Sequence, residues 1–468
     1  MISVYREFLA QRKDEMIRHI QNLVRIESVE GLPQPGQPFG RGPAQALAYV
    51  LQLGKDLGFR IENLDNYAGW LETGAGERTV AVLTHVDTVP AGKGWTVDPF
   101  CGELRDGRIY GRGSYDDKGP AIASIYALLA LEHIGWQPKK RARLIFGTNE
   151  ETGMQDLVYY LQHQPQPDQA FSPDAPCPVV YGEKGVLEQE IFCPVGSGTQ
   201  LLEISCDGGW KMIPGQAGAV LHWPVGMGPQ FPADREALGF SISREGDNLL
   251  LTVTGKGAPA AYPQQGCNAA AALLRWLAAF PGLEQPIQRQ LTQAVQYLGR
   301  DERGQAWGCA MADEISTPLT MALVGMELRE QCLVLRIHIR YPVQGNAESI
   351  FAANSRVMAA TGWEVKVTRH SPAHYVPADS PLVRALMEVY RQATGDVAAQ
   401  PVTMTGGTYA RALRNAVAFG PLFPGEAQLA HEPDESVSVE SLLRAADLYA
   451  QALYRLCCDE EDLWRSNP

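Results

Sequence analysis

Short runs of β-branched residues alternate with helix-forming segments between residues 78 and 185, and this alternation limits the possible folds more than any other feature of the chain. The runs are RTVAVLTHVD, RARLIFGTNEE and CPVVYGEKG. One helix is expected after Asp117, with Pro120 in its first turn and Gly135 at its end, and another from about Asp156. Strands that alternate with helices predict βαβ units, a mostly parallel sheet and an α/β fold.

The character of the sequence changes twice along the chain. From about 186 to 378 the predicted strands are shorter, their connections are rich in Gly and Pro, and one strong helix is expected at NAAAALLRWLAAF. From 379 to 468 the α/β pattern returns, with a strand in NAVAFGPLF and a closing helix in VESLLRAADLYAQALYRL. We therefore expect a discontinuous first domain, residues 1–185 and 379–468, interrupted by an inserted α+β domain at 186–378.

Composition and charge exclude several classes of partner. The 468 residues carry a formal net charge of −13, which leaves no broad basic surface for nucleic acid. No window approaches about 18 consecutive apolar residues, and the N-terminal segment lacks the apolar core of a signal peptide, so no membrane span is expected. The nine cysteines are dispersed and form no CxxC pair, which indicates reduced thiols in a cytoplasmic protein and no cysteine-built zinc site.

Acidic residues and histidines stand close to the predicted strands and helices at five points. In an open α/β sheet ligands bind at the carboxyl ends of the strands, so these side chains are expected to gather at one edge. Carboxylates gathered in this way repel one another unless a cation neutralises them. The side chains concerned are His85 and Asp87, Asp116 and Asp117, Glu150 and Glu151, Asp174, and His431.

This inventory suits a pair of divalent metal ions. Two ions about 3.5–4 Å apart could share one carboxylate as a bridge while each takes further His, Asp or Glu ligands. Imidazole and carboxylate ligands without thiolate suit zinc, and cobalt or manganese equally well.

Each of these residues alone also has a simpler interpretation. A single histidine at a strand end is more often a core histidine than a ligand, and paired acids before a helix commonly cap its N-terminus. The glycine-rich GRGSYDDKG segment lacks the spacing of a phosphate-binding loop, and its glycines suit tight turns. On this interpretation Glu150 and Glu151 form a solvated loop pair, Asp174 is a turn residue and His431 is a loop histidine.

The ordered set of motifs resembles a known family, the di-zinc exopeptidases that include aminoacylases, bacterial glutamate carboxypeptidases and carnosinase-type dipeptidases. The resemblance is strongest to the peptidase V-type dipeptidases, and it spans most of the chain. The matching segments occur in the family's order: THVDTVPAGKGWTVDPF, GRIYGRGSYDDKGP, GTNEETG, FSPDAPCPVVYGEKG, IRYP, GGTYAR and AHEPDESVSVESL.

The resemblance implies a role for each residue of the set. His85 and Asp174 would hold one metal ion, Glu151 and His431 the other, and Asp116 would bridge the two. Asp87 would orient His85, and Glu150 would be the general base that takes a proton from the attacking water. The family's peptide bond after the bridging aspartate is cis, which falls here between Asp116 and Asp117.

The resemblance also implies a substrate and a way of holding it. The reaction would be hydrolysis of a dipeptide or another short peptide, and the inserted domain would be a lid that closes over it. Arg340, Gly406, Gly407 and Arg411 would receive the free carboxylate of the substrate. Without the family context, Arg340 reads as a surface arginine on a strand. No partner beyond the peptide is implied, and a monomer is favoured over a homodimer.

Two positions of the inserted domain depart from the peptidase V pattern. Pro259, in GKGAPAAYPQQGCN, stands where the family has a histidine that helps to hold the carbonyl oxygen, and proline offers no donor. Lys211, in GGWKMIP, stands where the family has an asparagine donor. Loss of one such donor typically costs about 10²–10³ in rate.

Three interpretations of these departures stay open at this stage. Lys211 could itself stabilise the negative oxygen, which would preserve peptide hydrolysis. The protein could be a catalytically weak metal-binding homologue, or an amidohydrolase for N-acyl amino acids or another peptide-like amide. The complete ligand set and the intact Glu150 favour an enzyme over a protein that only binds metal.

Overall fold

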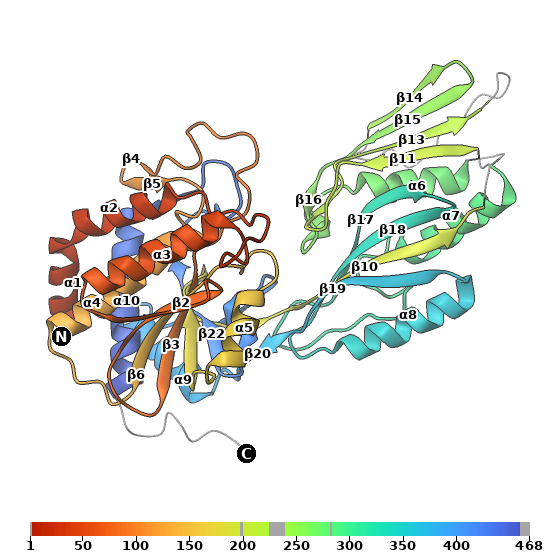
Figure 1. Cartoon of the computed structure of the whole chain (residues 1–468). Helices are drawn as coiled ribbons and strands as arrows, with labels where there is room; N and C mark the ends of the chain where they lie inside the picture. The colour runs from red at the N-terminus through yellow and green to blue at the C-terminus, as the bar shows by residue number, and fades with distance from the viewer. Residues whose placement is uncertain (1, 197–199, 224–238, 281–282, 459–468) are drawn as a thin grey trace. The chain divides into compact units, whose positions relative to one another are not determined.

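The computed structural model describes residues 2–196, 200–223, 239–280 and 283–458. The chain divides into two compact units, and each is described here by itself. Unit 1 comprises Met1–Gly182 and Tyr375–Pro468, and unit 2 comprises Glu183–His374. Figure 1 colours the chain from red at its start to blue at its end, so that unit 1 contains both ends of the colour range and unit 2 the middle.

The core of unit 1, within the described residues, is a nine-stranded mixed sheet. Its central pairs β6–β3, β3–β7 and β7–β22 are parallel, whereas β1–β2, β2–β6 and β22–β9 are antiparallel. The α/β class predicted from the alternating pattern is confirmed, with the antiparallel pairs confined to the flanks. The strand order is β1 (Arg60–Leu64), β2 (Ala68–Thr73), β6 (Arg141–Gly147), β3 (Thr79–His85), β7 (Gln169–Ser172), β22 (Ala416–Ala418), β9 (Val180–Glu183) and β20 (His374–Tyr375), with β21 (Val402–Met404) also paired to β9.

Helices pack on the central strands of this sheet. The helix predicted after Asp117 is α4 (Lys118–His133), which ends before Gly135 at φ +62° and packs against β3 and the closing helix α10 (Val439–Cys458). Helix α5 (Gln155–His163) packs through Leu157 and Tyr160 onto Leu83 and Ile145. The described part of unit 1 also contains α1 (Ile2–Gln11), α2 (Lys13–Val24), α3 (Arg41–Asp56), α9 (Pro381–Thr394) and the short 3-10 helix η2 (Tyr409–Ala412).

Small ladders outside the main sheet hold the loops that follow the strands. A three-stranded sheet has the order β24 (Ser436–Ser438), β5 (Arg108–Tyr110) and β4 (Glu103–Arg105). A second, parallel ladder joins β23 (Pro421–Leu422) to β8 (Ala175–Pro176). These ladders join segments that are far apart in the sequence, next to Asp116, Asp174 and His431.

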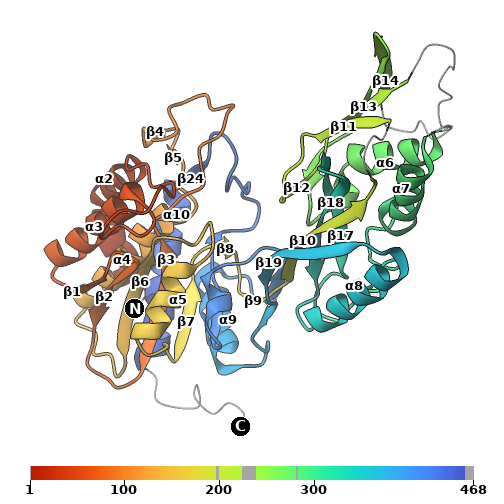
Figure 2. The ribbon, with the colours of Figure 1, turned by 45° about the vertical axis from the view of Figure 1, so that its right-hand side comes forward.

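Unit 2 has the α+β character expected from its sequence. One sheet has the order β17 (Thr320–Arg329), β18 (Cys332–Tyr341), β10 (Gly185–Pro194) and β19 (Glu364–Ser371), and all its pairs are antiparallel. A second sheet has the order β11 (Leu201–Cys206), β13 (Gln216–His222), β15 (Asn248–Thr254) and β14 (Gly239–Glu245). Figure 2 shows α6 (Ala269–Ala279) and α7 (Gln285–Leu298) side by side, and α8 (Ala347–Thr361) beside β19.

Within the described residues, no helix has both the length and the apolar character needed to cross a membrane.

Candidate metal centre

The predicted histidines and acids of unit 1 stand where its strands end. His85 is the last residue of β3, and both it and Asp87 are buried. Asp116 lies in the loop between β5 and α4, and Asp174 lies between β7 and β8. Glu150 and Glu151 follow β6, and His431 lies between β23 and β24. The ends of β3, β6 and β7 meet at one edge of the main sheet, and the loops that carry Asp116 and His431 reach the same place, so residues far apart in the sequence come together.

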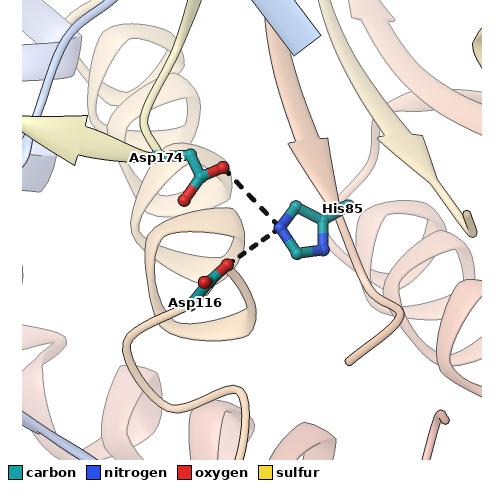
Figure 3. A group of neighbouring side chains, drawn as sticks. All are labelled: His85, Asp116 and Asp174. Atoms are coloured by element: carbon teal, nitrogen blue, oxygen red, sulfur yellow. Dashed lines mark hydrogen bonds and ion pairs between the residues drawn. The ribbon is translucent and has the colours of Figure 1, made fainter. Parts of the chain in front are cut away.

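His85, Asp116 and Asp174 form the first group of possible ligands. The Nε2 atom of His85 lies 3.0 Å from Asp116 Oδ1 and 3.8 Å from Asp174 Oδ2. Figure 3 shows both carboxylates pointing toward the same ring nitrogen. The three residues each offer one ligand atom within 4.8 Å of the others.

Asp116, Glu151 and His431 form a second group that shares Asp116 with the first. His431 Nε2 lies 3.2 Å from Asp116 Oδ2 and 3.0 Å from Glu151 Oε1. The two oxygens of Asp116 therefore face different histidines. A carboxylate in this position can bridge two ions. The peptide bond that follows it, Asp116–Asp117, is cis, as the family resemblance predicted.

Asp87 contacts His85 as well as the backbone of Glu150 and Glu151. Its backbone carbonyl lies 3.1 Å from His85 Nδ1, and its carboxylate lies 3.5 Å from the same nitrogen. The carboxylate also accepts the backbone N–H groups of Glu150 at 3.2 Å and Glu151 at 3.1 Å. Asp87 therefore contacts both the imidazole of His85 and the turn that carries the acid pair.

The electrostatics of the site fit bound cations. Burial raises the pKa of Asp174 well above its usual value and that of Glu150 to about 8. Burial alone would lower the pKa of His431, but hydrogen bonds with Asp116 and Glu151 raise it to about 10. Carboxylates crowded together in a buried site repel one another, and divalent cations would relieve that repulsion. The residues therefore fit a pair of divalent ions.

A family comparison identifies the class of protein. A model described as Peptidase family M20/M25/M40 matches residues 81–455. The chain belongs to peptidase family M20/M25/M40. The resemblance inferred from the ordered motifs is thereby confirmed, and the chain is an enzyme of the metallopeptidase class.

Individual relatives match over almost their whole length. The chain is 36% identical to "Putative dipeptidase YtjP" of Bacillus subtilis over 460 residues, covering 95% of this chain and 98% of the relative. It is 34% identical to the "Beta-Ala-Xaa dipeptidase" of Lactobacillus delbrueckii subsp. lactis over 473 residues, covering 98% of this chain and 99% of the relative. Human carnosine dipeptidase 1 has the same fold, with a TM-score of 0.60 at 14% identity over 97% of this chain and 98% of that one.

Sequence reasoning missed two buried acids that hold the loops of this M20/M25/M40 peptidase. Asp156 accepts the backbone N–H groups of Thr148 at 2.6 Å and Asn149 at 2.7 Å, and it also accepts the hydroxyl of Tyr409. Tyr409 belongs to the GGTYAR segment, so Asp156 joins that segment to the turn before Glu150. Glu435 makes similar contacts beside Asp116. Its place inside the quoted AHEPDES segment was the available signal.

The residues expected to hold the substrate carboxylate are divided between the units. Gly406 and Gly407 are exposed in unit 1, and Arg411 Nη2 donates to the Gly406 carbonyl at 3.1 Å. A Cβ at Gly407 would lie 2.1 Å from Arg411 Nη2, so only glycine lets the guanidinium lie against this loop. Arg340 lies on β18 of unit 2, half-buried, where its Nε donates to His338 Nε2 at 2.9 Å.

The two positions that depart from the peptidase V pattern are neighbours in unit 2. Pro259 lies in β16 (Ala258–Pro259), paired with Met212 of β12 (Met212–Ile213). The Lys211 carbonyl accepts the Ala260 N–H at 2.8 Å. Both Lys211 and Pro259 are exposed, so the two substitutions alter one small surface of this ladder.

Proposed function

We propose that this M20/M25/M40 peptidase is a di-metal dipeptidase that hydrolyses dipeptides or other short peptides. The observation that carries the proposal is the pair of His/carboxylate groups that share Asp116, with Glu150 beside them in neither group. The two relatives described above, both named as dipeptidases and both more than 30% identical over nearly the whole chain, support this substrate class.

The proposed ligands are His85 and Asp174 for one ion, Glu151 and His431 for the other, and Asp116 for both. When bound, such ions supply a Lewis acid and lower the pKa of water toward neutrality. Zinc is the proposed metal, with manganese or cobalt as alternatives, because the ligands are imidazole and carboxylate.

Glu150 is the proposed general base. Its neighbour Glu151 is 3.0 Å from His431 and belongs to a ligand group, whereas Glu150 belongs to none. Burial raises the pKa of Glu150 to about 8, and cations bound beside it would lower that pKa, so that the carboxylate could accept a proton near neutral pH. Asp87 keeps Glu150 in place by accepting its backbone N–H at 3.2 Å.

The inserted residues 186–378 are the proposed lid, and the flanking segments 1–185 and 379–468 the proposed catalytic domain. Arg340, Gly406, Gly407 and Arg411 would bind the substrate carboxylate, and Lys211 would face the developing negative charge on the carbonyl oxygen. We also propose the monomeric state and cytoplasmic location expected from the sequence.

The test is release of free amino acid from a panel of dipeptides and N-acetyl amino acids by protein loaded with zinc or manganese. Turnover confined to dipeptides supports the proposal, with Glu150→Ala as the blank. Turnover of N-acetyl amino acids alone would identify an amidohydrolase instead. No turnover of either class by protein that binds both ions would contradict the proposed reaction.

His431→Ala is expected to reduce metal content from about two ions per chain to about one, because it removes a ligand of only one group. Atomic emission of dialysed protein measures this directly. His163→Ala is a matched control, since His163 lies on α5 and contacts the Tyr159 carbonyl. Retention of both ions in His431→Ala would remove His431 from the ligand set.

Pro259→His is expected to raise kcat on ordinary dipeptides by up to about 10²-fold, because it restores a side-chain donor at an exposed position of the β12–β16 ladder. Steady-state kinetics with one dipeptide suffice. Pro259→Ala is the control, since it removes the ring without supplying a donor. A kcat for Pro259→His equal to or below that of the wild type would indicate that a donor at this position does not contact the carbonyl oxygen of the substrate.

A further inference from the structure

Glu435 is a buried carboxylate that the proposed reaction does not use. It immediately precedes β24 and is 0% exposed. One oxygen, Oε1, accepts the backbone N–H groups of Tyr115 at 3.0 Å and Asp116 at 3.2 Å. Glu435 therefore fixes the main chain at the residue that both ligand groups share.

Arg112 completes the contacts of Glu435 and extends them to a second loop. Its Nη1 donates to Glu435 Oε2 at 2.5 Å, and its Nη2 donates to the carbonyl of His431 at 3.1 Å. The guanidinium also lies 5.3 Å from the centre of the Trp95 ring and is 1% exposed. The ion pair thus joins the main chain at Asp116 to the main chain at His431.

The backbone at His431 needs such support. Its φ of +67° lies in the left-handed region that L-residues with a side chain rarely adopt. The chain segments next to Asp116 and His431 also meet in the β5–β24 ladder and through the Gly111 N–H, which donates to the Glu435 carbonyl at 2.9 Å. The first group has other supports, since His85 is held by Asp87 and by a bond of 3.2 Å from its backbone N–H to Asp117 Oδ2.

Stability alone does not account for the pair. A buried ion pair is often no better for folding than apolar residues of the same volume. Arg112 Nε, moreover, is buried without a hydrogen-bond partner among the described residues. The orientation of the guanidinium lets Nη1 and Nη2 reach Glu435 and His431, although Nε is left without a hydrogen bond. This orientation indicates that holding the two loops in place is a role of the pair.

We propose that Arg112 and Glu435 are a positioning pair that holds Asp116 and His431 at the spacing required by the ion of the second group. This rests on the proposed two-ion site. The pair touches neither substrate nor ion, and it acts through the main chain of two ligands. Its removal should weaken the second ion more than the first, because the second group loses the support of both Asp116 and His431 and the first group loses only that of Asp116.

The test is competition for Zn²⁺ between the full chain and a chromophoric chelator, which gives a dissociation constant for each ion. The ion that His431→Ala loses defines the second site. In Glu435→Gln that site is expected to bind Zn²⁺ about 10–100-fold more weakly, the usual effect of losing a group that orients a ligand. The first site shares Asp116 with the second and keeps the supports of His85, so it should weaken by a clearly smaller factor.

Arg112→Lys gives an independent measurement. A single ammonium keeps the charge beside Glu435 but lacks the planar fork that reaches both Glu435 and His431, so the same selective weakening is expected. Glu72→Gln is the matched control, because Glu72 forms a comparable ion pair of 2.6 Å with Arg143 on strands β2 and β6.

The outcomes separate this inference from the proposed function. Wild-type protein that binds fewer than two ions would contradict the proposed function itself. Wild-type affinity at the second site in either variant, or equal weakening of both sites, would overturn the positioning pair alone. If both variants fail to fold while Glu72→Gln folds, the pair is structural and the inference is wrong.

Discussion

Replacing Glu150 with glutamine is expected to lower kcat by about 10²–10⁴-fold while both metal ions remain bound. Glutamine keeps the size of the side chain and cannot accept the proton of the attacking water. Glu150 belongs to neither ligand group, and the bond between its N–H and Asp87 is made by the backbone and survives the substitution. Dipeptide kinetics and metal analysis on the same sample measure the two effects.

The matched control is Glu151→Gln, in the next residue. Glu151 lies 3.0 Å from His431 Nε2 and is a proposed ligand, so this variant should lose metal as well as activity. The pair of variants separates the base from the ligand. Near wild-type kcat in Glu150→Gln, or a loss of metal equal to that in Glu151→Gln, would show that the roles of the two glutamates are assigned wrongly.

Sequence patterns predicted the part of the fold that local chemistry determines. The strand that ends at His85 and the helix that begins after Asp117 could be predicted because the residues within each segment determine both its type and its ends. The convergence of His85, Glu151 and Asp174 followed from one rule, that side chains after parallel strands meet at the carboxyl edge. Asp116 and His431 join them from loops next to the smaller ladders. The antiparallel strands β1 and β2 were not predicted.

Contacts between distant segments could not be predicted in this way. Arg112 and Glu435 are separated by 323 residues, and neither lies in a periodic pattern that points to the other. Lys211 and Pro259 were recognised as two separate departures, but only the β12–β16 ladder makes them neighbours. Asp87 was expected to orient His85, while its bonds to the backbone of Glu150 and Glu151 depend on how the turn folds.

Replacing Asp116 with asparagine is expected to have the most general effect, loss of both ions and of all dipeptide hydrolysis. Asp116 faces His85 through one oxygen and His431 through the other, at 3.0 and 3.2 Å. Burial alone would raise the pKa of Asp116, but hydrogen bonds from the two histidines lower it well below its usual value, so the group is an anion in the folded protein. A neutral amide cannot replace that charge between two cations.

The affinity of each site for Zn²⁺ should fall by more than the roughly 10–100-fold that loss of an orienting group costs, because a ligand itself is removed. Asp117→Asn is the matched control. Burial raises the pKa of Asp117 well above its usual value, and the side chain accepts the His85 N–H at 3.2 Å, which an amide oxygen can also do. Asp117→Asn should therefore retain both ions. Since His431→Ala removes one ion and Asp116→Asn both, loss of a single ion in Asp116→Asn would show that the two groups do not share this carboxylate.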